Sequence, residues 1–285
     1  MHSRMLSSTF LMYLGLMLTA CDSVSKSQEQ TTSTASNNVQ VLENVLTIPQ
    51  LNRSRTIRLY LPPDYEQSNV HYPVVYMHDG QNLFDNSTAP YGEWQIDESL
   101  NELARDSQFN IIVVGIDNGG DDYRLHELSP WENKEYGKAE GEEYAEFIVK
   151  TLKPYIDQRY RTLPERENTA IFGSSMGGLI SHYLAFNYPE VFGKVGILSP
   201  SYWYSEQVFD FTYSHQPEQS LAIYMATGAK EPEIMRDNHR KMLRVFSETG
   251  SDNINVRAHI VAEADHNESF WSNEFKLGIL WLFQT

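Results

Sequence analysis

A short run of small residues around Ser175 is typical of a turn that carries a nucleophile. A strand-like segment at 169–172 leads into Gly-Ser-Ser-Met-Gly-Gly, and a helical pattern follows. This is G-x-S-x-G in the strand–turn–helix context that exposes a serine. Gly173 and Gly177 are small enough to let strand and helix approach. Glycine-rich loops also cradle phosphate, but the chain has neither G-K-[S/T] nor the third glycine of a dinucleotide fingerprint. We therefore predict that Ser175 is a nucleophile.

The base that would activate this serine is predicted to be His266. A serine hydroxyl needs a base to take its proton, and a third group must orient that base. In hydrolases with this turn the chain order is Ser, acid, His. His266 follows Val261, the last residue of a predicted strand, by five positions and precedes the last predicted helix. The only other histidine nearby, His259, falls inside the strand. The alternative is a surface histidine that caps the helix.

The orienting acid is expected near the end of an earlier strand. The segment 222–226 is followed by Thr-Gly-Ala-Lys-Glu-Pro-Glu, in which Glu231 is the acid closest to the strand end. From there its carboxylate can reach the loop that contains His266. We predict Glu231, with Glu233 and Asp237 as alternatives.

Two backbone N–H groups are needed to stabilise the oxyanion of an acyl-transfer reaction. One is expected from Met176, directly after the serine. The other is expected from the loop after the strand-like segment 72–77, where Gly80 permits a turn and the amide of Gln81 follows. The alternative for this second loop is an ordinary strand-end turn.

These residues fall among alternating strand and helix patterns. Short apolar segments with strand character lie at 45–48, 56–61, 72–77, 111–116, 169–172, 195–198, 222–226 and 256–261. Helical patterns lie at 94–105, 142–157, 177–187, 233–247 and 269–282. The first two strands are expected to pair antiparallel. The alternation predicts an α/β fold whose mostly parallel sheet is covered on both faces, with the site at the carboxyl ends of the strands.

Composition excludes some classes of partner. The chain of 285 residues has 22 basic and 38 acidic residues, a formal net charge of −16. Such a surface repels phosphate backbones and anionic lipid, so nucleic acid is not expected to bind. No H-E-x-x-H motif or cysteine cluster indicates zinc. The acidic run 117–122 lacks the glycine at the sixth loop position and the closing glutamate of a calcium loop, so we expect a turn there. No metal and no cofactor are predicted.

The N-terminal residues have the pattern of a lipoprotein signal. A weakly basic start and an apolar core at 10–18 end in Leu-Thr-Ala-Cys, which resembles a bacterial lipobox. We predict a signal peptide at 1–20, lipidation of Cys21, a disordered polar tether at 21–39 and the folded domain at 40–285. Cys21 is also the only cysteine. The expected location is the bacterial cell envelope, anchored by lipid and facing the periplasm or the exterior.

Several longer motifs carry a family resemblance. Their sequences, in chain order, are YMHDGQNLFD at 76–85, GIDNG at 115–119, GSSMGG at 173–178, SPSYW at 199–203, GAKE at 228–231 and HNESFW at 266–271. From about residue 45 to its end the chain resembles the esterase D type of esterases. That group includes ferric-siderophore esterases, S-formylglutathione hydrolases, feruloyl and acetyl-xylan esterases, and the mycolyltransferases.

The resemblance implies an α/β-hydrolase fold and a set of site residues. It implies a triad of Ser175, Glu231 and His266, and it places Trp203 beside the pocket. It also implies that the oxyanion hole is formed by the amides of Gln81 and Met176. Many relatives carry an aspartate at the position of Glu231, and either carboxylate can orient a histidine.

The sequence does not single out one substrate class. Aromatic side chains near the predicted strand ends, Trp94 and Trp203 among them, suit sugars, aryl acids or catecholates. The first hypothesis is a serine esterase that acts on a small-molecule or oligosaccharide ester. An acyltransferase with the same acyl-enzyme is the second, and a non-catalytic, lipid-anchored binding protein is the third.

Overall fold

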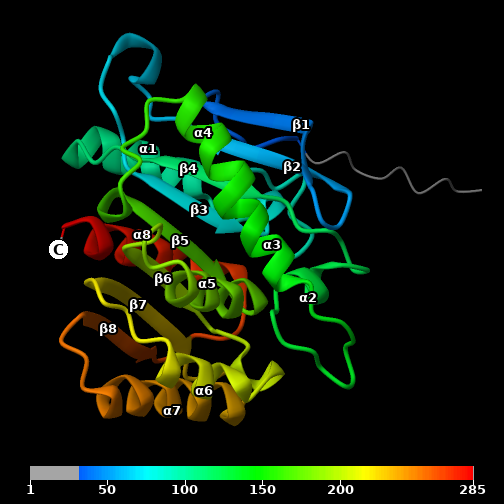
Figure 1. Ribbon diagram of the computed structural model, residues 1–285. Helices are drawn as coiled ribbons and strands as arrows, with labels where there is room; N and C mark the ends of the chain where they lie inside the picture. Colours follow the sequence, from blue (N-terminus) through cyan, green and yellow to red (C-terminus); the bar gives the residue numbers. More distant parts are fainter. Residues whose placement is uncertain (1–31, 285) are drawn as a thin grey trace, which may run out of the picture. The chain divides into compact units, whose positions relative to one another are not determined.

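A computed structural model describes residues 32–284 of the protein (Figure 1). Eight strands form one sheet in the order β1-β2-β4-β3-β5-β6-β7-β8. Their bounds are β1 Val39–Ile48, β2 Arg53–Tyr60, β3 Val74–His78, β4 Ile112–Ile116, β5 Thr169–Ser174, β6 Lys194–Leu198, β7 Leu221–Gly228 and β8 Ile254–Val261. Strands β1 and β2 run antiparallel, and β3 to β8 are parallel to one another. The predicted α/β-hydrolase class is confirmed, including the antiparallel opening pair.

Helices cover both faces of this sheet. The α-helices are α1 Ile96–Ser107, α2 Arg124–Glu127, α3 Gly141–Phe147, α4 Lys153–Arg159, α5 Met176–Asn187, α6 Gln207–Ser214, α7 Glu233–Thr249 and α8 Glu268–Gln284. Apolar side chains of α1 and α8 form one core with the sheet, while α3 to α7 contribute to the other. Figure 1 shows α3, α4 and α5 crossing in front of the strands. The central strands β3, β4 and β5 are buried along their whole length, which explains their unbroken apolar sequences.

Two departures from the expected helices have local causes. The helix predicted at 142–157 contains a π-helical turn at Ile148–Leu152 between α3 and α4. Pro154 follows this turn and has no N–H to continue the regular ladder, which makes a wider turn favourable. Helix α6 is absent from the sequence prediction, because its aromatic and β-branched sequence has strand-like composition. Its Val208 and Phe209 become buried in the core, so tertiary packing determines its conformation.

The end of the predicted tether is held against the domain, and this corrects our boundary at residue 40. Thr34 Oγ1 donates to Glu93 Oε2 at 2.8 Å, and the amide of Ser36 donates to Asp97 Oδ2 at 2.7 Å. Strand β1 then begins at Val39. The predicted signal peptide and Cys21 lie outside the described residues. Within the described part of the chain, no helix is long and apolar enough to cross a membrane.

Candidate active site

The predicted nucleophile lies on a strained turn between β5 and α5. Ser175 has φ 55° and ψ −121°, a conformation unusual for a residue with a side chain. The two glycines permit the turn, since a Cβ on Gly173 would lie 2.6 Å from the backbone of Gly177. The amide of Ser175 donates to the carbonyl of Leu198, at the end of neighbouring β6. The geometry agrees with the pattern that led to this prediction.

A chain of hydrogen bonds joins the three predicted side chains. Ser175 Oγ lies 3.1 Å from His266 Nε2, and His266 Nδ1 lies 3.0 Å from Glu231 Oε2. The serine and the histidine are 91 positions apart in the sequence. The order of groups is the one required for a hydroxyl, a base and an orienting acid.

Two adjacent loops bring the acid and the histidine together. Glu231 follows the end of β7, and His266 lies between β8 and α8. A Cβ on Gly228 would lie 2.4 Å from the carbonyl oxygen of Ala264, and the amide of Lys230 donates to that oxygen at 2.9 Å. Because Gly228 has no side chain, the two loops approach closely enough for the carboxylate to reach the imidazole.

The carboxylate of Glu231 is buried and has several donors. The residue is 1% exposed. Its Oε1 accepts from Ser199 Oγ and from the amide of Gly228, both at 2.6 Å. These donors compensate for the cost of burying a charged group.

The other two acids considered from the sequence lie elsewhere. Glu233 and Asp237 are exposed on α7, and Asp237 pairs with Arg240 at 2.8 Å. Neither has a hydrogen bond to His266 among the described residues. The structure therefore brings Glu231, and not the alternatives, to the histidine.

The amides expected to bind an oxyanion are unoccupied donors. Gln81 lies in a short 3₁₀ turn, Gly80–Asn82, at the end of β3, and Met176 is the first residue of α5. Within residues 32–284, no acceptor outside its own helix is bonded to the N–H of either residue, and the first N–H groups of a helix have no partner inside it. Gln81 and Ser175 line the same cleft. Both amides are thus free to bind a ligand oxygen.

Two clefts meet at Ser175 and His266. The first, which we call the polar cleft, has a volume of about 810 Å³. Its side chains include Gln81, Tyr91, Trp94, Asn118, Asp121, Arg124, Glu268 and Trp271. The second, the apolar cleft, has about 340 Å³ and is lined by Ser201, Trp203, Pro232, Ile234 and Met235 in addition to the shared pair. A substrate bound at Ser175 can therefore extend in two chemically different directions.

The two tryptophans predicted to contact substrate differ in exposure. Trp203 is 40% exposed and forms part of the apolar cleft. Trp94 lines the polar cleft but is only 4% exposed, and its ring lies 5.9 Å from that of Trp271. Trp203 can offer an aromatic face to a ligand, whereas Trp94 mainly supports the wall.

The polar cleft also holds an ion pair that the sequence prediction does not include. Arg124 Nε and Nη2 donate to the two carboxylate oxygens of Asp79 at 2.7 and 2.8 Å, and Asn118 Nδ2 donates to Oδ1 at 2.6 Å. Burial opposes ionisation of Asp79, but the guanidinium outweighs it and lowers the pKa of the carboxyl. The pair fixes the turn before Gln81. Asp79 belongs to a recognised motif, while Arg124 lies in a helix too short to predict.

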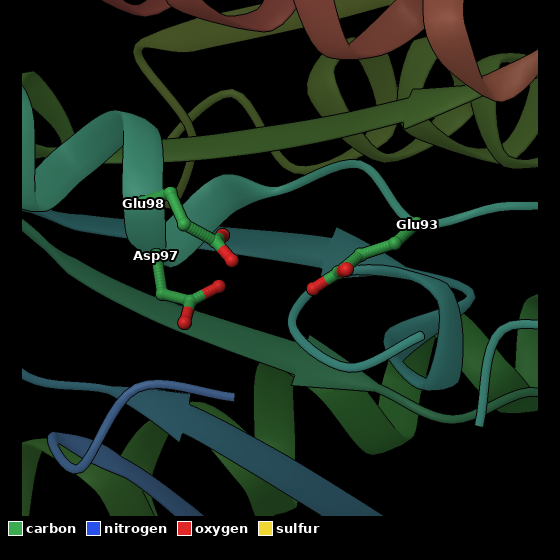
Figure 2. A group of neighbouring side chains, drawn as sticks. All are labelled: Glu93, Asp97 and Glu98. Atoms are coloured by element: carbon green, nitrogen blue, oxygen red, sulfur yellow. The ribbon is translucent and has the colours of Figure 1, made fainter. Parts of the chain in front are cut away.

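A separate group of carboxylates lies at the start of α1 (Figure 2). Oxygen atoms of Glu93, Asp97 and Glu98 all lie within 4.8 Å of one another, close enough to hold a metal ion. Partial burial, together with the carboxyl of Asp97, raises the pKa of Glu98 to about 7. The Glu98 carboxyl is therefore only partly ionised near neutral pH. None of the three residues lines the polar or the apolar cleft as the described residues form them.

Comparison with known proteins identifies the family of this chain. A family model described as "Putative esterase" matches residues 48–281. The chain belongs to this esterase family. The match covers nearly all of the described domain, including the three hydrogen-bonded side chains and both clefts. The protein is thus a carboxylic ester hydrolase, as the sequence motifs led us to expect.

The chain is also similar to individual proteins in sequence or in structure. The uncharacterised protein YbbA of Bacillus subtilis (strain 168) is 26% identical over 244 residues, 81% of this chain and 93% of its own length. The iron(III) enterobactin esterase of Escherichia coli (strain K12) is 30% identical over 135 residues, 45% of this chain and 31% of that protein. The solved structure of an IroE-like serine hydrolase from Shewanella oneidensis has a TM-score of 0.70 at 21% identity, and the match covers 86% of this chain and 80% of the other. At that identity the structural match shows the shared fold alone.

Proposed function

We propose that the protein is a serine esterase that forms an acyl-enzyme on Ser175. The observation that carries the proposal is the hydrogen-bonded chain from Ser175 through His266 to Glu231. In this chain His266 is placed to take the serine proton, and Glu231 is placed to hold His266 in the required tautomer.

In the first half of the reaction, Ser175 Oγ attacks the ester carbonyl carbon while its proton passes to His266 Nε2. The carbonyl oxygen becomes an oxyanion, which accepts hydrogen bonds from the amides of Gln81 and Met176. The bond to the alcohol oxygen then breaks, and His266 returns the proton to that oxygen. The alcohol leaves, and the acyl group remains on the serine.

In the second half, water takes the place of the alcohol. His266 removes a proton from the water as it attacks the acyl carbon, and the oxyanion forms again at the same amides. The bond from carbon to Ser175 Oγ breaks, and the proton returns to the serine. Throughout, Glu231 orients the imidazole and stabilises its positive charge.

The two clefts support a substrate with an apolar part and a hydroxyl-rich part. Trp203 and Ile234 of the apolar cleft are 40% and 51% exposed and can cover an aliphatic or aryl group. In the polar cleft, Arg124 is already paired with Asp79, so Asp121 and Glu268 leave an acidic surplus. This charge disfavours a polyanionic ferric siderophore and favours a neutral sugar-like alcohol. We therefore rank sugar acyl and aryl esters above siderophore esters as substrates.

An active-site label tests the chemistry directly. A fluorophosphonate probe should modify Ser175, because only an activated hydroxyl attacks phosphorus rapidly. Ser175→Ala should abolish both labelling and the release of p-nitrophenol from short acyl esters. The matched control is Ser174→Ala, which should retain both. Labelling of Ser174 in the native protein would contradict the assignment. Adding an alcohol acceptor to the assay separates hydrolysis from acyl transfer, since a transferase would form the new ester in preference to the acid.

A lipid anchor on Cys21 remains a second proposal, supported by the lipobox-like end of the predicted signal peptide. It would place the enzyme in the cell envelope, facing the periplasm or the exterior. Mass spectrometry of the mature N-terminus tests it. An acylated Cys21 as first residue is expected, and an unmodified chain that retains Met1 would refute the proposal.

A further inference from the structure

A buried serine behind the acid has a strained backbone and two polar contacts. Ser199 directly follows β6, has φ 43° and is 0% exposed. Its Oγ lies 2.6 Å from Glu231 Oε1 and 2.9 Å from Trp271 Nε1. A serine at positive φ costs free energy, and such positions persist where the surroundings require them. The hydroxyl therefore occupies a defined place between the acid and the indole.

The chemistry of the two contacts fixes the direction of the hydroxyl proton. An indole N–H can only donate, so Ser199 Oγ must accept from Trp271. A serine hydroxyl has a single proton, and that proton is then directed at the carboxylate of Glu231. With the amide of Gly228 at 2.6 Å, Oε1 has two donors, which leaves Oε2 to His266.

Trp271 also contacts the histidine directly. Its ring lies 4.9 Å from the imidazole of His266 at an interplanar angle of 87°, an edge-to-face arrangement. The residue is 6% exposed, and its remaining surface contributes to the wall of the polar cleft. One side chain thus touches the base through its ring and reaches the acid through its N–H and Ser199.

We propose that Ser199 and Trp271 are positioning residues that hold Glu231 ionised and aligned with His266. This inference rests on the proposed function of the triad. When His266 receives the serine proton, its positive charge is stabilised only if Glu231 remains an anion with Oε2 toward Nδ1. The donors on Oε1 favour that anion. Two other ionisable groups lie close to Glu231. Arg236 donates from its guanidinium to the backbone carbonyl of Glu231, and it stays charged. Burial lowers the pKa of His239 to about 4, so that histidine stays neutral.

Two substitutions test the Ser199 hydroxyl and the Trp271 N–H that orients it separately. Ser199→Ala removes the donor to Glu231 and should lower kcat about 10- to 100-fold, the range for one lost hydrogen bond to a charged group, with little change in KM. Trp271→Phe keeps a ring beside His266 but frees the Ser199 hydroxyl to rotate, so a smaller loss of about 3- to 10-fold is expected.

The pH profile distinguishes positioning from packing. With one donor fewer on Oε1, the negative charge of Glu231 is less well compensated and favours a positive charge on His266 more strongly. The acidic limb of kcat/KM should therefore move to higher pH in Ser199→Ala. A residue with only a structural role would lower thermal stability and leave this limb in place.

Matched controls come from side chains of the same kind elsewhere. Ser181 is buried on α5, and its Oγ has no partner among the described residues, so Ser181→Ala should leave kcat and the pH limb unchanged. Trp131 packs on Tyr183 and Phe211 outside both clefts. Trp131→Phe should therefore also leave kcat and the acidic limb unchanged.

The outcomes separate this inference from the proposed function. Suppose that Ser175→Ala is inactive, but that Ser199→Ala and Trp271→Phe keep kcat within twofold of the parent enzyme and leave the acidic limb of kcat/KM in place. The positioning role is then refuted, and the serine mechanism stands. If Ser175→Ala retains turnover, the mechanism itself fails. Loss of kcat together with the shifted limb in Ser199→Ala, at an unchanged yield of folded protein, supports the positioning role.

Discussion

At the scale of single residues, burial separates the three carboxylates that the sequence places after β7. Glu231 is enclosed and receives donors on both oxygens, whereas Glu233 and Asp237 are exposed on α7. A carboxylate that orients a base must keep one geometry throughout the reaction. Only an enclosed side chain with several fixed partners satisfies this requirement.

The first prediction concerns this acid. Glu231→Gln should leave the fold intact and lower kcat by several orders of magnitude, since an amide facing His266 Nδ1 favours the wrong tautomer. The analogous exchange in the serine protease triad lowers kcat by about 10⁴-fold. Turnover of a p-nitrophenyl ester measures it, with circular dichroism as a check on folding.

The control variants for this prediction are Glu233→Gln and Asp237→Asn. Both should change the free energy of unfolding by no more than about 0.5 kcal/mol and keep near-normal turnover. If Glu231→Gln keeps more than about a tenth of the parent rate, a barrier change under ~1.4 kcal/mol, Glu231 is not the acid.

At the scale of elements, the close approach of β5 and α5 depends on glycine. A Cβ at Gly173 would lie 2.6 Å from the backbone of Gly177, which cannot move aside without displacing the helix. A Cβ at Gly177 would meet His78 Cβ at 3.2 Å, a milder overlap. The two positions should therefore differ in their tolerance of a methyl group.

The second prediction follows from that difference. Gly173→Ala should lower the free energy of unfolding by about 3 kcal/mol or more, and Gly177→Ala by about 1 kcal/mol, as expected for overpacking against backbone and against a side chain. Urea denaturation of the purified variants provides the comparison. Equal stability of the two would mean that the turn relaxes freely.

The third prediction concerns a histidine that joins several helices. His182 of α5 bonds to Tyr202 and Thr212 at 2.8 Å each and stacks with Phe186 and Phe246. Burial lowers its pKa from 6.5 to about 3, so the folded protein keeps it neutral while the unfolded chain is protonated below pH 6.5. Its contribution to stability is thus complete above pH 6.5 and is lost as the pH falls toward 3.

Urea titrations at several pH values test this contribution. In His182→Gln, the loss of stability below pH 6.5 should be shallower than in the parent by up to about 1.4 kcal/mol per pH unit. His182→Gln is also expected to be less stable at neutral pH, since the stacked ring is lost. Parallel pH profiles for the two proteins would show that His182 does not titrate as its burial requires.

At the scale of the whole molecule, the boundary of the folded domain depends on contacts made by residues 33–38. Ser33 and Thr34 bond to acids that precede α1, and Asn38 Nδ2 donates to the carbonyl of Leu61 at 2.6 Å. These contacts connect the start of the described chain to both the sheet and the loop before α1. The segment is part of the domain.

The fourth prediction compares two truncations. Deleting residues 1–31 should leave stability and turnover unchanged, because every contact described above is retained. Deleting residues 1–39 should keep activity but lower the free energy of unfolding by about 1 to 3 kcal/mol, since several hydrogen bonds and the first residue of β1 are lost. Thermal melts and ester turnover measure both. An unchanged melting temperature in the shorter form would show that the segment contributes nothing.

The sequence by itself determines much of the site through local chemistry. The turn at Ser175 is specified by two glycines and by the strand and helix beside it, all within about twenty consecutive residues, so its geometry is encoded locally. The apolar strands and periodic helices are encoded in the same way. The histidine follows from its place between the last strand and the last helix.

Tertiary structure alone decides which distant residues meet. The choice of Glu231 depends on the loop contact at Gly228, and the pairing of Arg124 with Asp79 depends on two segments 45 positions apart. Ser199 reaches Glu231 only because β6 and β7 are neighbours in the sheet. Such contacts form at the ends of strands whose order is set by the packing of the whole core, and residue type or spacing along the chain does not specify that order.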